Sequence, residues 1–289
     1  ANCLDNLGEF DAALQLLQRV LNGQIAQIGE DHPKTLHTLN NIASAYKNLE
    51  QLDKAREVYE RTLRIKQRVL GPDDHSTIVT AMNLASVHLD EGRLDDAEAM
   101  YLDAVARLEG RSGPGDPRIA AYNGLGLVWR KRGDAAKAEP YVRQAVEAAR
   151  QSIGARHPTL ITLLANLASV QMEARQFADA EASARQAIAL AGETVGANHR
   201  TALNPRRLLA RALAAQERFD EAGDTLAAAV EEISQWPGNT RDLAPVDIVK
   251  YYDRAGQTAK ADPWRSLAAA ATTQPATLPT AANSVSSSR

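Results

Sequence analysis

The sequence repeats itself with a period of about 42 residues, and this period restricts the fold more than any other feature. IGEDHPKTL at residues 28–36 has a counterpart, VGANHRTAL, at 195–203. The same glycine position recurs at Gly29, Gly71, Gly113, Gly154 and Gly196, and a second marker recurs at Ala13, Ala55, Ala97, Ala138, Ala180 and Ala222. Two markers with the same period indicate one supersecondary unit stacked repeatedly along the chain.

The spacing of apolar residues predicts two helices in each unit. Apolar residues recur at steps of three or four in residues 35–49 and again in residues 52–70, which is the spacing of a helix with one buried face. Polar joints such as NLEQLD and DEGRLD separate the two stretches. Residues expected to cap the second helices are Asp53, Asp95 and Asp220, and residues expected to end the first helices are Gly92 and Gly133.

Composition agrees with closely packed helices. Apolar residues make up 44% of the chain but aromatic residues only 4%, so the core must consist mainly of small and aliphatic side chains. Alanine or glycine at a helix crossing lets two axes approach to roughly 8 Å. We therefore expect an all-α protein.

Charge and hydropathy exclude two classes of partner. The net charge of −3 provides no broad attraction to nucleic acid or to anionic lipid. No apolar run approaches the roughly 18 residues of a membrane-spanning helix. The single Cys3 cannot form an internal disulfide, which is compatible with a reducing, cytoplasmic environment. We expect no nucleic-acid partner and no membrane contact in this segment.

The repeated unit resembles the tetratricopeptide repeat. The motif elements are a Leu-Ala pair, a bulky residue, a glycine, Phe or Leu, and the marker alanine. The long period and the Gly-x-x-His segment are similar to the kinesin light chain-like type of this repeat. The resemblance covers about residues 1–238, with departures at Gly126, Leu208 and Gly223. It implies a right-handed superhelical solenoid of antiparallel helix pairs, in which one helix of each pair lines a concave groove.

This alignment predicts the domain organisation. We expect a truncated first repeat at 1–28, with its missing half upstream, and a degenerate capping hairpin at 239–268. The remaining residues, 269–289, are rich in Ala, Thr, Ser and Pro and are expected to be a disordered tail. Between the ends lie five repeats, at 29–70, 71–112, 113–153, 154–195 and 196–238.

Catalytic motifs are missing from the sequence, so we expect a protein that is not an enzyme and uses no cofactor. His32, His157 and His199 share one repeat position, but neighbouring hairpins lie roughly 8–10 Å apart, too far for these histidines to share one metal ion. We expect them to close helix starts. The GLG sequence at 124–126 lies between helical segments, and we expect it to serve helix packing rather than phosphate binding.

Asparagines mark the expected groove. Asn41, Asn83 and Asn166 each precede the Leu/Ile-Ala pair, and in related domains asparagine at this position contacts bound peptide. An amide both donates and accepts hydrogen bonds, so a row of amides can hold a peptide backbone of any sequence. Alternatively, these amides tie adjacent repeats together. Further candidates for the groove are His37, Asn40, Ser44, Ser86, Asn123, Arg130, Ser169, Asn204, Arg207 and Arg211.

The arginines among these candidates gather toward the C-terminal end. They either pair with acidic groups or a carboxylate of a partner, or form a solvated helix face.

The predicted function is a protein–protein interaction scaffold that binds a peptide segment of a partner protein in its groove. The alternative is a regulatory or substrate-recruiting C-terminal region of a larger bacterial signalling enzyme, such as a serine/threonine kinase. A third hypothesis, a helical-repeat RNA reader, conflicts with the negative charge.

Overall fold

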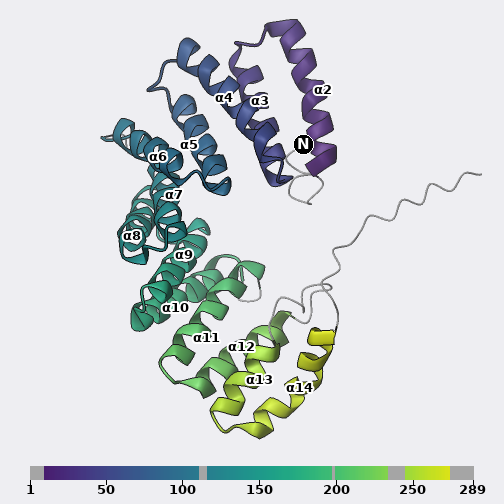
Figure 1. The fold of residues 1–289 in the computed structure, drawn as a ribbon, viewed down its shortest axis with the longest axis vertical. Coiled ribbons are helices and arrows are strands. Elements are labelled where there is room, and N and C mark those ends of the chain that lie inside the picture. The colour runs from purple at the N-terminus through teal and green to yellow at the C-terminus, as the bar shows by residue number, and fades with distance from the viewer. Residues whose placement is uncertain (1–9, 111–115, 197–198, 234–244, 274–289) are drawn as a thin grey trace, which may run out of the picture. The chain divides into compact units, whose positions relative to one another are not determined.

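The computed structural model describes residues 10–110, 116–196, 199–233 and 245–273 (Figure 1). Thirteen α-helices and one short 3₁₀-helix, η1, account for the regular structure of these residues. They divide into two compact units, residues 1–174 and residues 175–289, and each is considered by itself.

The first unit contains eight helices in its described part. Each packs against the next along the chain, and α3 also contacts α5, as α5 contacts α7. The first helices of successive pairs therefore lie beside one another. The helices are α2 (Phe10–Ile28), α3 (Pro33–Asn48), α4 (Leu52–Val69), α5 (His75–Asp90), α6 (Leu94–Arg107), α7 (Arg118–Lys131), α8 (Ala135–Ser152) and α9 (Thr159–Glu173).

The second unit continues the pattern, because α10 to α14 again pack in sequence. Its elements are α10 (Phe177–Thr194), η1 (Arg200–Ala202), α11 (Leu203–Ala215), α12 (Phe219–Ile233), α13 (Pro245–Arg254) and α14 (Thr258–Thr273). The prediction of an all-α solenoid of sequential antiparallel helix pairs is confirmed.

The predicted repeat boundaries can be set against the helices. Each of the five ranges between 29 and 238 contains two consecutive α-helices, and α13 and α14 form a sixth pair. Helix α14 runs to Thr273, past the boundary expected at 268. Residues 274–289 and residues 1–9 lie outside the described part of the chain, as does Gly113.

One repeat position caps the first helices. The Nδ1 atom of His32 accepts a hydrogen bond from the Lys34 backbone at 3.2 Å. His157 does the same for the Thr159 backbone at the start of α9, at 3.2 Å, and His199 does so for the Thr201 backbone in η1, the 3₁₀ turn before α11, at 3.3 Å. Asp74 and Asp116 fill the equivalent position with carboxylates. The expectation that these histidines close helix starts is confirmed.

The second helices begin differently from the prediction. Asp53, Asp95 and Asp220 are not caps, because they lie inside the first turns of α4, α6 and α12. A carboxylate there still faces the positive end of the helix dipole. Gly92 and Gly133 have φ angles of 79° and 77° at the joints after α5 and α7, so they end these helices as predicted.

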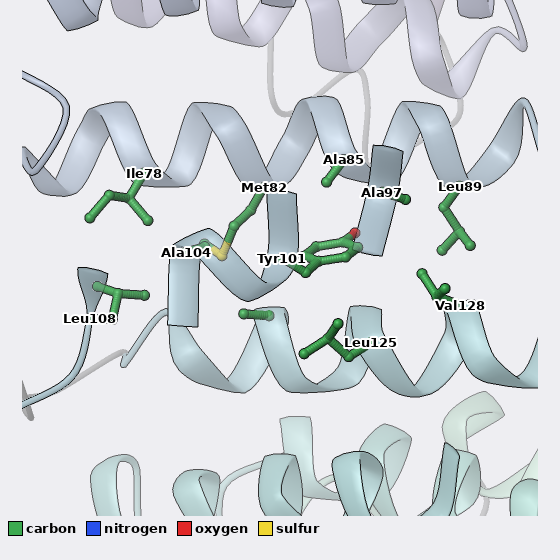
Figure 2. Packing of buried hydrophobic residues seen from close by; sticks show 11 residues of the cluster. Ile78, Met82, Ala85, Leu89, Ala97, Tyr101, Ala104, Leu108, Leu125 and Val128 are labelled. Atoms are coloured by element: carbon green, nitrogen blue, oxygen red, sulfur yellow. The ribbon is translucent and has the colours of Figure 1, made fainter. Parts of the chain in front are cut away.

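Glycine also permits close packing inside the helices. Figure 2 shows the Tyr101 ring of α6 inserted between α5 and α7. A Cβ atom on Gly124 would lie 2.4 Å from Cζ of this ring. Equivalent contacts would occur between Gly126 and Val142, at 2.3 Å, and between Gly223 and the Tyr252 ring, at 2.6 Å. The GLG sequence therefore serves helix packing, as predicted.

Ala97 provides a test of the helix crossing. It is fully buried in the cluster formed by α5, α6 and α7. We expect Ala97→Leu to lower the free energy of unfolding by roughly 1–3 kcal/mol, because extra carbon atoms must force the helices apart. Chemical denaturation with circular dichroism measures this change, and unchanged stability would contradict a tight crossing at Ala97.

Two glycines form a matched pair for a second test. Gly124 lies under Tyr101, whereas a Cβ atom added to Gly23 in α2 would meet no other atom within 4 Å. We expect Gly124→Ala to destabilise the fold by about 1–2 kcal/mol through steric overlap. Gly23→Ala should stabilise it by about 0.5–1 kcal/mol, because alanine favours helix. Equal effects of the two substitutions on thermal unfolding would contradict a steric restriction at Gly124 by Tyr101.

Candidate functional site

A cavity of about 450 Å³ lies between the first helices α5 and α7. Its size is within the range of ordinary ligand sites. Apolar side chains contribute Val79, Met82, Leu89 and Leu127, and polar side chains contribute Asn83, Ser86 and Asn123. Lys47 at the end of α3, His75 and Asp90 add charged or titratable groups. We call this surface the α5–α7 groove.

A chain of polar contacts crosses one side of the α5–α7 groove. The Lys47 Nζ atom donates to Ser86 Oγ at 2.6 Å and lies 3.2 Å from a carboxylate oxygen of Asp90. Ser86 also forms a hydrogen bond with the hydroxyl group of Tyr101. Burial raises the pKa of Tyr101 to about 12. The Tyr101 hydroxyl therefore stays neutral and fixes Ser86. Lys47 and Asp90 compensate each other, so the groove combines an apolar floor with a locally neutral polar edge.

The predicted asparagines separate into two groups. Asn166 donates to the Asn123 side-chain oxygen at 2.9 Å, so this pair ties α9 to α7. Asn83 lines the α5–α7 groove, and Asn41 lies half-buried on α3. Within the described residues, neither the Asn41 nor the Asn83 side chain has a hydrogen-bond partner. Their amides therefore remain available to a ligand.

Asn40 belongs to a buried network between repeats. Its side-chain oxygen accepts from Thr80 Oγ1 at 3.1 Å, and Thr80 in turn accepts from the Lys66 amine at 2.8 Å. Burial lowers the pKa of Lys66, while the nearby Asp74 carboxylate partly opposes this shift. Lys66 also donates to Ser76 Oγ at 2.6 Å. These contacts connect α3, α4 and α5 and leave the Asn40 oxygen engaged.

Other predicted residues of the first unit take different positions. His37 is exposed on α3, and Ser169 is half-buried on α9. Ser44 hydrogen-bonds the Tyr59 hydroxyl, whose pKa is raised to about 12 by burial. Arg130 lies 3.5 Å from a carboxylate oxygen of Glu173. None of these four side chains lines the α5–α7 groove.

The remaining candidates lie in the second unit. Asn204, Arg207 and Arg211 are all exposed on α11. They belong to a separate surface of that unit and are not part of the α5–α7 groove.

Sequence reasoning missed several residues of the groove. It followed the polar positions of the repeat, whereas Val79 and Met82 are apolar at the positions that His37 and Asn40 occupy one repeat earlier. This substitution of apolar for polar residues was a usable signal. Lys47 and Asp90 are harder to detect, because their contact depends on the packing of α3 beside α5.

The described residues hold no group of three or more His, Cys, Asp or Glu side chains arranged for a metal ion. Among the helices described, none has the length and apolar character needed to span a bilayer.

Solved structures with this architecture include proteins of the kinesin light chain type. BtubC (BKLC) from P. vanneervenii is 19% identical, with a TM-score of 0.66 over 82% of this chain and 99% of that protein. Nearly identical repeats assigned to a kinesin light chain of Podosopora anserina are 21% identical, with a TM-score of 0.53 over 66% and 92%. The apo form of RapI is 13% identical, with a TM-score of 0.60 over 93% of each chain.

Sequence comparison identifies the family directly. No curated protein sequence matches the chain significantly. The tetratricopeptide repeat family, however, matches residues 1–68, 37–110 and 117–193. These ranges cover more than half of the chain and include every helix that borders the α5–α7 groove. The chain belongs to the tetratricopeptide repeat family, whose domains are generally protein–protein interaction modules.

Proposed function

We propose that this chain is a non-catalytic scaffold that binds an extended peptide segment of a partner protein in the α5–α7 groove. The observation that carries the proposal is an apolar cavity beside an amide without an internal partner. Asn83 has no hydrogen-bond partner among the described residues and borders a cavity floored by Val79, Met82 and Leu127. A peptide supplies both complements, an apolar side chain and a polar backbone.

The cavity favours a ligand with one bulky apolar side chain. Its volume of about 450 Å³ exceeds that of a single large side chain, so the neighbouring peptide backbone can also enter. Leu89 and Leu127 provide apolar contact area for this side chain. Burial of one such side chain contributes about 1.5–3 kcal/mol before the cost of ordering the peptide.

The amides can hold the peptide backbone. The Asn83 side chain can donate to a backbone carbonyl and accept from a backbone N–H. Asn41 offers the same pair of groups one repeat earlier. Because each polar contact contributes little net energy, we expect dissociation constants on the order of micromolar.

A random peptide library displayed on phage, selected on the full chain, provides ligands for the test. Selected peptides should share a large apolar residue, and their affinities are measured by fluorescence anisotropy. Ala120→Trp fills the groove from an exposed position on α7, and we expect it to weaken binding at least about tenfold, the equivalent of 1.4 kcal/mol. Asn83→Ala should weaken binding about three- to tenfold, the effect of losing one or two hydrogen bonds.

Two exposed positions supply matched controls. Ala99→Trp adds the same ring to the outer side of α6, and Asn22→Ala removes an exposed amide from α2. Both should leave affinity unchanged, and circular dichroism confirms that all four variants fold. Failure to enrich any peptide, or equal binding by Ala120→Trp and the original chain, would remove the α5–α7 groove as the site.

A further inference from the structure

Equivalent asparagines on the first helices differ in their hydrogen bonds. The Asn166 side chain of α9 donates to the Asn123 oxygen of α7 at 2.9 Å. Two repeats earlier, Asn83 of α5 occupies the position of Asn166, and Asn40 of α3 occupies the position of Asn123. The Asn83 side chain nevertheless has no hydrogen-bond partner among the described residues. The repeat therefore places these two asparagines in equivalent positions, but they do not bond each other.

The difference lies in the residue that contacts the earlier asparagine of each pair. Thr80 Oγ1 donates to the Asn40 side-chain oxygen at 3.1 Å, and Thr80 is fully buried. A hydrogen bond to a buried hydroxyl turns the Asn40 oxygen toward the interior. At the position of Thr80, α9 carries Leu163. Leucine has no hydroxyl, so the Asn123 oxygen remains free to accept from Asn166.

Lys66 of α4 supports the contact between Thr80 and Asn40. The Lys66 amine donates to Thr80 Oγ1 at 2.8 Å and to the Ser76 carbonyl oxygen at 3.2 Å. An ammonium group only donates, so Thr80 accepts from it and keeps its own proton to donate. The Ser76 carbonyl, 2.9 Å from Thr80 Oγ1, is the other acceptor for this proton. Because this carbonyl already receives a hydrogen bond from Lys66, Thr80 can donate to Asn40 without leaving it unpaired.

Both polar residues are replaced together where the asparagines bond each other. Ala149 of α8 occupies the position of Lys66, and Leu163 occupies that of Thr80. Both of these apolar residues are buried. Neither offers a donor to the Asn123 oxygen, so the neighbouring amide of α9 supplies it. The hydrogen bonds of each asparagine pair therefore follow from the buried residues beside it.

We propose that Thr80 is a positioning residue of the α5–α7 groove. By holding the Asn40 oxygen, Thr80 keeps the Asn83 amide available to the backbone of a bound peptide. A peptide carbonyl or N–H then supplies the bond that an internal amide supplies in α9. This role of Thr80 rests on the proposed function, since a free amide in the groove changes affinity only if a peptide reaches it.

Thr80→Val tests this role, because valine keeps the shape of threonine and removes the hydroxyl. The Asn40 oxygen should then accept from Asn83, and a fluorescein-labelled peptide from the phage selection should bind about three- to tenfold more weakly in fluorescence anisotropy. Thr80→Val/Asn40→Ala should restore most of the affinity, because it removes the competing oxygen. A general disturbance of the fold would persist in the double variant. Unchanged affinity in Thr80→Val, or a loss that the second substitution does not reverse, would overturn the proposal.

Thr38→Val is the matched control. Thr38 occupies the position of Thr80 one repeat earlier, is buried, and donates to the Gln24 side-chain oxygen at 2.7 Å. The substitution therefore also removes a buried hydroxyl that bonds a second helix, but one that does not contact Asn40. Peptide affinity should stay within about twofold of the original, and thermal unfolding compares the stability of the two variants. Equal weakening of peptide binding by both substitutions would contradict a specific role of Thr80.

Exchange of the side-chain amide protons provides a measurement that needs no peptide. In NMR spectra of the isotope-labelled original chain, assigned with Asn83→Ala and Asn166→Ala, the Asn166 amide should exchange with water more slowly than the Asn83 amide. Thr80→Val should slow the exchange of the Asn83 amide. Equal exchange of the two amides in the original chain, or no change in Thr80→Val, would overturn the proposal. Exchange in the expected order without any peptide binding would remove the proposed function and leave the bonding role of Thr80 intact.

Discussion

Close approach of helices at a small side chain is the constraint on which the whole fold depends. The marker alanine is fully buried in the second helix of each pair, that is, in α2, α4, α6, α8, α10 and α12. A side chain that ends at Cβ lets neighbouring axes come within about 8 Å, where dispersion contacts become dense. Tyr59 and Tyr101 fill the holes that remain beside these crossings. Their hydroxyl groups reach Ser44 and Ser86 on the first helices, so packing also fixes polar side chains on the inner positions of the repeat.

The sequence was informative wherever a contact depends on one position of the repeat. The marker alanines, the glycines of the joints and the capping residue at His32 each act within their own hairpin, so the period alone predicts their roles. Asp53 shows the limit of such local reasoning. A carboxylate near a helix start suits a cap and also the first turn, and only backbone geometry, which begins α4 at Leu52, distinguishes the two.

The groove could be predicted only in part, because its polar contacts join different positions of neighbouring repeats. Asn166 occupies the position of Asn83, yet it bonds Asn123, which occupies the position of Met82. The equivalent partner of Asn83 would be Asn40, one repeat earlier, but the Asn40 side-chain oxygen already accepts a hydrogen bond from Thr80. A single repeat pattern cannot reveal this, since it treats equivalent asparagines as equivalent. The tie between repeats is observed for Asn123 and Asn166, whereas Asn83 has no internal partner among the described residues.

Differences between residues at equivalent repeat positions also explain how helix pairs with the same backbone structure present different side-chain chemistry. In the first unit, Lys47 is paired with Asp90, so the edge of the α5–α7 groove is nearly neutral beside its apolar floor. In the second unit, α11 places Arg207 and Arg211 where earlier first helices have Asn40 and Ser44. No carboxylate among the described residues compensates them. The helix spacing itself does not depend on the residues at these positions of α11, because alanine and glycine on other faces set it. Substitution there changes the charge and polarity of the surface while the stacking stays the same.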